Sequence, residues 1–90
     1  MAAVTTDKGP YILALGPIKL EVATLSSVDD GDTFTTRIQR PEFALYLGTG
    51  DNNANAFETN CSISGKTITL NNSSLNGTNS ATGVILVFGF

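Results

Sequence analysis

Residues 59–70, with the sequence TNCSISGKTITL, show the clearest β pattern in the chain. Two runs in which apolar and polar residues alternate flank Ser64-Gly65, and a period of two is typical of strands whose faces differ. A two-residue loop at Ser64-Gly65 would pair Ile63 with Lys66. The pattern therefore predicts a hairpin with one half-buried face, made by Cys61, Ile63, Ile68 and Leu70.

Two other segments are apolar on both faces. Residues 43–47 would place Phe43, Leu45 and Leu47 on one face, with Ala44 and Tyr46 on the other. Residues 84–88 form a continuous β-branched and aromatic run. Strands that are buried on both faces have this composition. Both segments are therefore predicted to be central strands of a sheet.

Residues 18–25 alternate more clearly, with Ile18, Leu20 and Val22 on one face and Lys19 and Glu21 on the other. This pattern predicts a half-buried strand. A turn of Asp and Gly at residues 29–32 then leads to a Thr-rich strand over residues 33–38, and Pro41 interrupts the next segment.

About seven short strands at intervals of about 8–12 residues are typical of an antiparallel sandwich or barrel. The sequence predicts no amphipathic helix. We therefore expect an all-β fold, a small antiparallel β-sandwich or barrel over residues 18–90, with a loose N-terminal arm over residues 1–17.

The composition argues against several classes of function. Charged residues make up 14% of the chain, and five basic against eight acidic residues give a net charge of −3. Nucleic-acid binding needs clustered Lys and Arg, so no nucleic-acid partner is expected. The chain has no His and one Cys, which excludes an intrachain disulfide and a zinc site of Cys and His ligands.

No catalytic constellation is evident, so the sequence predicts a protein that is not an enzyme and needs no cofactor. Cys61 has no His to activate it and is expected to be a buried thiol. Residues 48–50 are glycine-rich but lack the Lys of a phosphate loop. The acidic turn at residues 29–32 lacks the ligand spacing of a calcium loop, and the sequence leaves weak calcium binding there open.

The N-terminal residues lack the basic and apolar regions of a signal peptide. The longest apolar runs are far shorter than the ~20 residues that span a bilayer. We therefore expect synthesis in a cytoplasm and no membrane partner.

The two strongly apolar segments carry more apolar surface than one small sandwich easily buries. This surplus predicts contact with another subunit, with Tyr11, Ile12 and Leu13 as anchors of the arm. An ordinary edge strand within the chain is the alternative for these three residues. The polar loops at residues 48–55 and 71–82 are further candidates for partner contacts.

The segment from Gly31 to Gly89 resembles small tailed-phage proteins that decorate or cement the capsid. The similar features are the Gly31-Asp32-Thr33 opening of a Thr-rich strand, the hairpin at residues 62–70, the following Asn/Ser/Gly loop and the closing run at residues 84–89. Residues 37–41 depart from the Gly-Leu step expected there. The resemblance implies a virion location on the capsid surface, the major capsid protein as partner, and a homo-oligomer, with a trimer favoured.

Two other functions remain open from the sequence. One is a carbohydrate- or host-binding module of a fibre or spike, with the Asn-rich loops and the Asp29–Asp32 turn as its site. The other is a tail-tube or connector protein.

Overall fold

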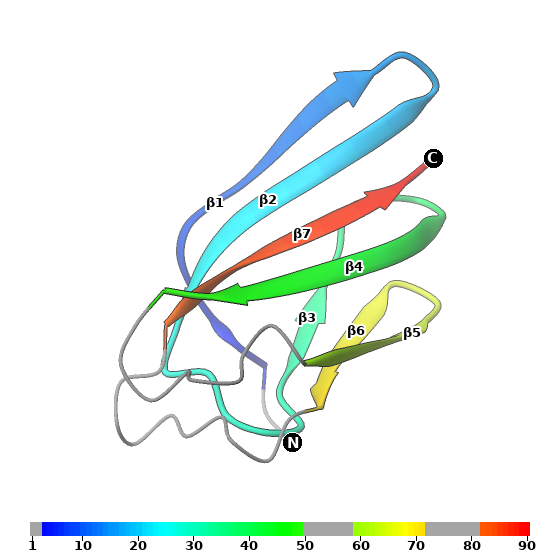
Figure 1. Ribbon diagram of the computed structural model, residues 1–90. Helices are drawn as coiled ribbons and strands as arrows, with labels where there is room; N and C mark the ends of the chain where they lie inside the picture. The colour runs from blue at the N-terminus through cyan, green and yellow to red at the C-terminus, as the bar shows by residue number, and fades with distance from the viewer. Residues whose placement is uncertain (1–2, 50–58, 72–81) are drawn as a thin grey trace.

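The computed structural model describes residues 3–49, 59–71 and 82–90 (Figure 1). All regular secondary structure in these ranges is β-strand, which confirms the predicted fold class. In chain order the strands are β1 (Thr5–Leu15), β2 (Ile18–Ser26), β3 (Thr33–Thr35), β4 (Pro41–Gly48), β5 (Asn60–Ser64), β6 (Thr67–Asn71) and β7 (Gly83–Gly89).

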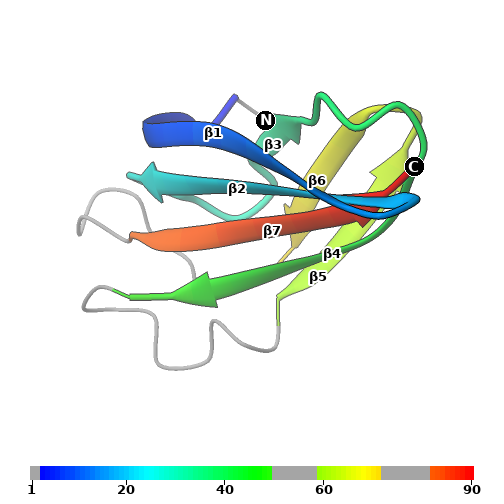
Figure 2. The same cartoon turned by 90° about the horizontal axis from the view of Figure 1, so that it is seen from above.

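The strands form two antiparallel sheets. One has four strands in the order β1-β2-β7-β4, and the other has three in the order β3-β6-β5. The three-stranded sheet lies on one side of the four-stranded sheet (Figure 2). The arrangement is therefore the predicted sandwich.

The core lies between the two sheets and is made of aliphatic and aromatic side chains. Its buried members come from both sheets and from the segments that connect them: Ala23, Leu25, Val28, Phe34, Ile38, Tyr46, Ile68, Leu70, Ile85 and Val87. Residues that alternate with them along β2, β4 and β7 point away from the core, as the pleat of a strand requires.

The β5–β6 hairpin is confirmed, but its loop lies one residue later than predicted. Ser64 pairs with Thr67 and Ile63 with Ile68, so the loop residues are Gly65 and Lys66. Gly65 has a φ of +61°, which fits the first position of a two-residue hairpin loop where glycine is favoured. The predicted apolar face is nevertheless correct, because Ile68 and Leu70 are buried while Cys61 and Ile63 are half-buried.

Of the two strands predicted to be central, one is central and the other is not. β7 lies between β2 and β4, whereas β4 is an edge strand of the same sheet. The prediction for β4 was wrong because it took two apolar faces as the sign of a central strand, whereas the second face of β4, with Phe43 half exposed, is not covered by the described chain.

The alternation predicted in β2 is correct, but the buried side is the unexpected one. Glu21 is fully buried on the side of Ala23 and Leu25, while Leu20 and Val22 are only half-buried. The pleat places Glu21 on the core side because Ala23 and Leu25, further along the strand, are core residues.

The described part of the predicted N-terminal arm is a strand that pairs with β2 along its length, from Thr5 opposite Ser26 to Leu15 opposite Ile18. This is the edge-strand alternative. At its beginning, Ala3 bridges Thr33 of the other sheet, and Val4 N donates a hydrogen bond of 2.8 Å to Thr33 O. The segment therefore connects the two sheets on one side of the sandwich.

The acidic segment before β3 is a turn, as predicted. Asp32 N donates to Asp29 O at 3.1 Å, and Asp29 N donates to Asp32 Oδ2 at 3.0 Å. Gly31 has a φ of +86°. The side chains thus cap the turn itself.

Candidate interaction surface

The side of the four-stranded sheet that faces away from the core is apolar across all four strands. The strand register places its side chains in rows. We call this surface the outer face, and its rows are Leu13, Leu20, Phe88 and Phe43, then Tyr11, Val22, Leu86 and Leu45, and then Lys8, Thr24, Val84 and Leu47. Lys8, at the β1 edge of the last row, is the one charged residue in these rows.

The large side chains at the edges of the outer face are the most exposed. On β4, Phe43 is 51% exposed and Leu45 is 48% exposed, and Leu13 on β1 is 52% exposed. The side chains on the two central strands, such as Leu86, are half-buried by these neighbours. Figures 1 and 2 show none of the described strands in front of this face. The described chain therefore leaves it open to solvent.

The outer face is apolar because the pleat gives each strand two independent sets of side chains. In β7 the set Ile85 and Val87 fills the core, while the set Val84, Leu86 and Phe88 points outward. The outward set is as apolar as the core set. A sheet with one solvated face normally alternates apolar residues with polar ones. The apolar residues on both faces of this sheet are instead typical of a sheet that is buried on both sides.

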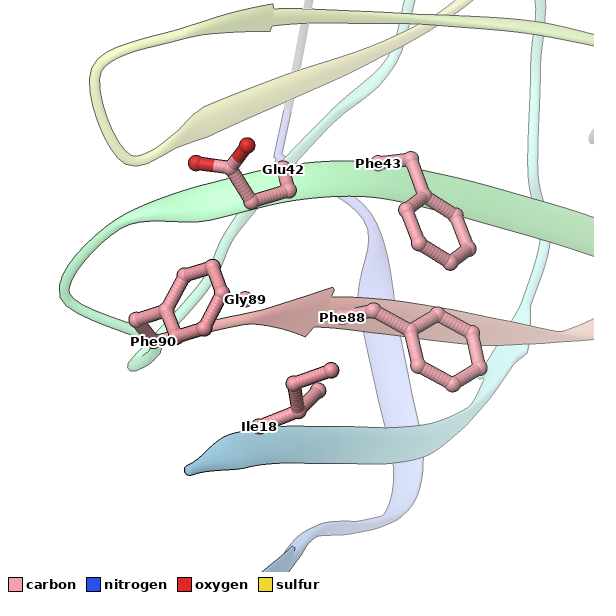
Figure 3. Close-up of a pocket in the computed structure, with 6 residues that line it drawn as sticks. All are labelled: Ile18, Glu42, Phe43, Phe88, Gly89 and Phe90. Atoms are coloured by element: carbon pink, nitrogen blue, oxygen red, sulfur yellow. The ribbon is translucent and has the colours of Figure 1, made fainter. Parts of the chain in front are cut away.

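One end of the outer face contains a hollow of about 300 Å³, lined by Ile18, Glu42, Phe43, Phe88, Gly89 and Phe90 (Figure 3). The rings of Phe43 and Phe88 stack with centroids 4.5 Å apart and form one of its walls. Glu42 supplies the one charged side chain of this lining. The hollow is therefore suited to an apolar side chain.

The end of β7 that forms this hollow is held in place by the chain before β4. Arg40 and Phe90 exchange two backbone hydrogen bonds of 3.1 Å each. The Arg40 guanidinium lies 5.8 Å from the centroid of the Phe90 ring, within the range of a cation–π contact. The shape of the hollow is thus fixed by backbone pairing.

A polar network around Glu21 supports the sheet from the core side. The Glu21 carboxylate accepts hydrogen bonds from the Thr36 hydroxyl and from Arg37 N, the latter at 3.1 Å. Arg37 Nε lies 3.5 Å from Glu21 Oε2, and Arg37 Nη2 donates to Pro10 O at 3.0 Å. The network ties β1, β2 and the segment between β3 and β4 together, so its role is structural.

The residues predicted to anchor a partner are divided by the pleat of β1. Tyr11 and Leu13 lie on the outer face, where Tyr11 pairs with Val22 and Leu13 with Leu20. Ile12 pairs with Glu21 and therefore points to the opposite side. The predicted polar contacts at residues 50–55 and 72–81 lie outside the described residues.

The sequence attributed the surplus of apolar residues in β4 and β7 to contact with another subunit, but it did not identify which side of these strands faces outward, and it did not include β2. The signal was present in the apolar set Phe43, Leu45 and Leu47 and in the set Val84, Leu86 and Phe88. The two sides of each segment were not distinguished, because apolar alternation alone does not tell which face packs inside.

Other chemistry is sparse in the described part of the chain. No group of three potential metal-ligating side chains occurs there. Burial raises the pKa of the Cys61 thiol to about 11, which makes it a poor nucleophile at neutral pH. None of the described segments is a helix that is long and apolar enough to cross a membrane.

Comparisons with protein-family models, with curated proteins and with solved structures give no match for this chain. The interpretation of the outer face therefore rests on its own residues.

Proposed function

We propose that this protein is a non-enzymatic structural module that works by binding other protein subunits through the outer face. The observation that supports this proposal is the apolar outer face itself, with Leu13, Phe43 and Leu45 each about half exposed and a single charged residue, Lys8, at one edge of its rows. Exposed apolar patches of more than a few hundred Å² on a small protein are typical of protein–protein contact sites.

The energetics favour association. Each Å² of apolar surface that leaves water contributes about 25 cal/mol. The outer face is presented by a rigid sheet, so few backbone degrees of freedom are lost on binding. A flat apolar surface without a deep polar cleft suits a subunit contact better than a soluble substrate.

Within this class, we propose the role of a virion protein that decorates or cements a phage capsid, with the major capsid protein as its partner. The resemblance of Gly31–Gly89 to such proteins supports this role. The outer face supplies the means of non-covalent attachment that the role needs. A tail-tube or connector protein would use the same kind of surface and is the alternative that the experiment below distinguishes.

The proposal is tested by co-expressing the chain with the head and tail genes of its genome and purifying heads and tails separately. We expect the wild-type protein on heads and a Leu45→Lys variant to be lost from them by at least about tenfold, because a charge enters the apolar contact. Thr67→Lys, an exposed position on β6 in the other sheet, is the matched control and should remain bound.

Recovery of the protein with tails would show the connector role instead of the capsid role. Recovery with neither particle, for a folded wild-type protein, would contradict the proposal. Equal incorporation of Leu45→Lys and Thr67→Lys would show that the outer face is not the contact surface.

A further inference from the structure

The exposed area of the outer face is close to the area that one partner contributes to a standard protein interface. A whole aromatic side chain offers about 150–250 Å², so the half-exposed and half-buried side chains of the outer face together offer on the order of 700 Å². A standard protein interface takes about 800 Å² from each partner. We propose that the occupant of the outer face is a second copy of this chain, packed face to face across a two-fold axis. This inference rests on the proposed function, because it concerns the same surface: the second copy covers the outer face of the free protein and leaves it when a capsid subunit binds there.

The outer face has complementary features at matching positions. At the β1 edge, Leu13 and Leu15 project and are each about half exposed. The hollow lies toward the β4 edge, and its wall residues Phe43 and Phe88 occupy the same cross-strand row as Leu13. A two-fold axis parallel to the strands exchanges the two edges and keeps each row level. Leu13 and Leu15 of each copy would then lie over the hollow of the other.

Charge does not oppose this pairing at the contact. The chain has a net charge of −3, but the rows of the outer face contain one charged residue, Lys8 at the β1 edge, and the two-fold axis places the Lys8 residues of the two copies at opposite edges of the contact. Glu21 is turned to the core and is paired with Arg37. Two acidic copies can therefore meet on this surface without bringing like charges together.

A single continuous patch also favours a pair over a ring. A two-fold interface uses the same patch on both subunits, whereas a trimer uses two different patches on each subunit. The described residues offer one extensive apolar face. Sheets packed face to face lie ~10 Å apart with their strands within about 30° of each other, which the open side of the sandwich allows.

The first test is the molar mass of the purified protein, measured by light scattering across a dilution series. We expect a dimer of twice the 9.4 kDa chain mass that dissociates on dilution. Leu13→Lys should raise the dissociation constant by at least about 30-fold, the size of an interface hot spot. Ile12→Lys changes the neighbouring residue, which points to the opposite side, and should leave the dissociation constant within about threefold.

The second test fixes the orientation by disulfide trapping in a Cys61→Ser background. Tyr11 and Leu45 lie in one row on opposite edges of the sheet, three strand spacings of ~4.8 Å apart, which is too far for a disulfide within one chain. We expect a mixture of the Tyr11→Cys and Leu45→Cys proteins to form covalent dimers under mild oxidation. Either protein alone should form few.

The outcomes separate the inference from the proposed function. A monomer at every concentration, a trimer, or cross-linking of Tyr11→Cys mainly to itself would overturn the proposed dimer. If a monomeric protein is still incorporated into heads and Leu45→Lys is not, the proposed function stands and the capsid subunit is the occupant. If the protein is dimeric but is found on no particle, the dimer stands and the proposed function fails.

Discussion

The two faces of the four-stranded sheet, built by the same strands, are both mainly apolar, but the described chain covers only one of them. The core face buries a carboxylate, Glu21, whereas the outer face leaves Phe43 and Leu45 half exposed. The buried charge is tolerated because Thr36 and Arg37 donate hydrogen bonds to it. No described segment covers the exposed apolar groups, so the core face explains the fold and the outer face points to function.

The largest expected effect tests the core face. Glu21→Ala should lower the free energy of unfolding by about 3–5 kcal/mol, because the Thr36 hydroxyl and Arg37 N each lose their acceptor, at about 1–3 kcal/mol each, and the exposed Arg37 guanidinium loses its ion pair. Urea unfolding measures this change. Lys19→Ala, at an exposed position of the same strand, should change stability by less than about 0.5 kcal/mol. Similar losses in the two variants would contradict the structural role of the network.

The next prediction compares the faces directly with apolar truncations. Ile85→Ala, in the core, should cost about 2–5 kcal/mol because a fully buried side chain leaves a cavity. Leu45→Ala, on the outer face, should cost less than about 1 kcal/mol when measured on dilute monomer, since its side chain is already half in water. A stability cost for Leu45→Ala as large as that for Ile85→Ala would show that the outer face is packed within the chain.

The smallest expected change in stability concerns Tyr46, a core residue with a buried hydroxyl. The Tyr46 hydroxyl is buried and has no hydrogen-bond partner among the described residues, and burial raises its pKa to about 12. Tyr46→Phe should therefore raise the free energy of unfolding by up to about 1 kcal/mol at neutral pH.

The same tyrosine gives a dependence on pH with a definite sign. In the unfolded chain its pKa is near 10 and in the folded chain about 12, so the unfolded state loses its proton first. Tyr46 then favours unfolding as the pH rises from 10 to 12. Tyr46→Phe should flatten the alkaline loss of stability in this range, and an unchanged slope would contradict the assignment.

The sequence predicted the strands better than it predicted which side of them is covered. Alternation correctly grouped Leu20 with Val22 and Phe43 with Leu45, because the period of two is a property of the backbone. Which group faces the core depends on how the sheets pack, and β4 was consequently misplaced at the centre. The β5–β6 loop lies one residue later than the sequence predicted, because the positive φ of Gly65 sets the first position of the loop.

The sequence predicted the candidate surface only indirectly, as an excess of apolar residues over what one small core can bury. The sequence indicated more apolar residues than one sandwich holds, and of the three residues that it predicted as partner contacts, Tyr11 and Leu13 lie on the outer face. It also named Ile12, which the pleat of β1 turns away. The contribution of Phe43 and Phe88 required the register of three strands, which brings residues distant in sequence into one row.

The most direct test of the account is hydroxyl-radical footprinting of the wild-type protein in its dissociated and its associated form, with a partner subunit or a second copy. Tyr11 and Phe43 should lose most of their reactivity on association, while Ile12, similarly apolar and exposed but on the opposite side of β1, should keep its reactivity. Unchanged labelling of Tyr11 and Phe43 in the associated form would show that the outer face is not where this protein meets its neighbours.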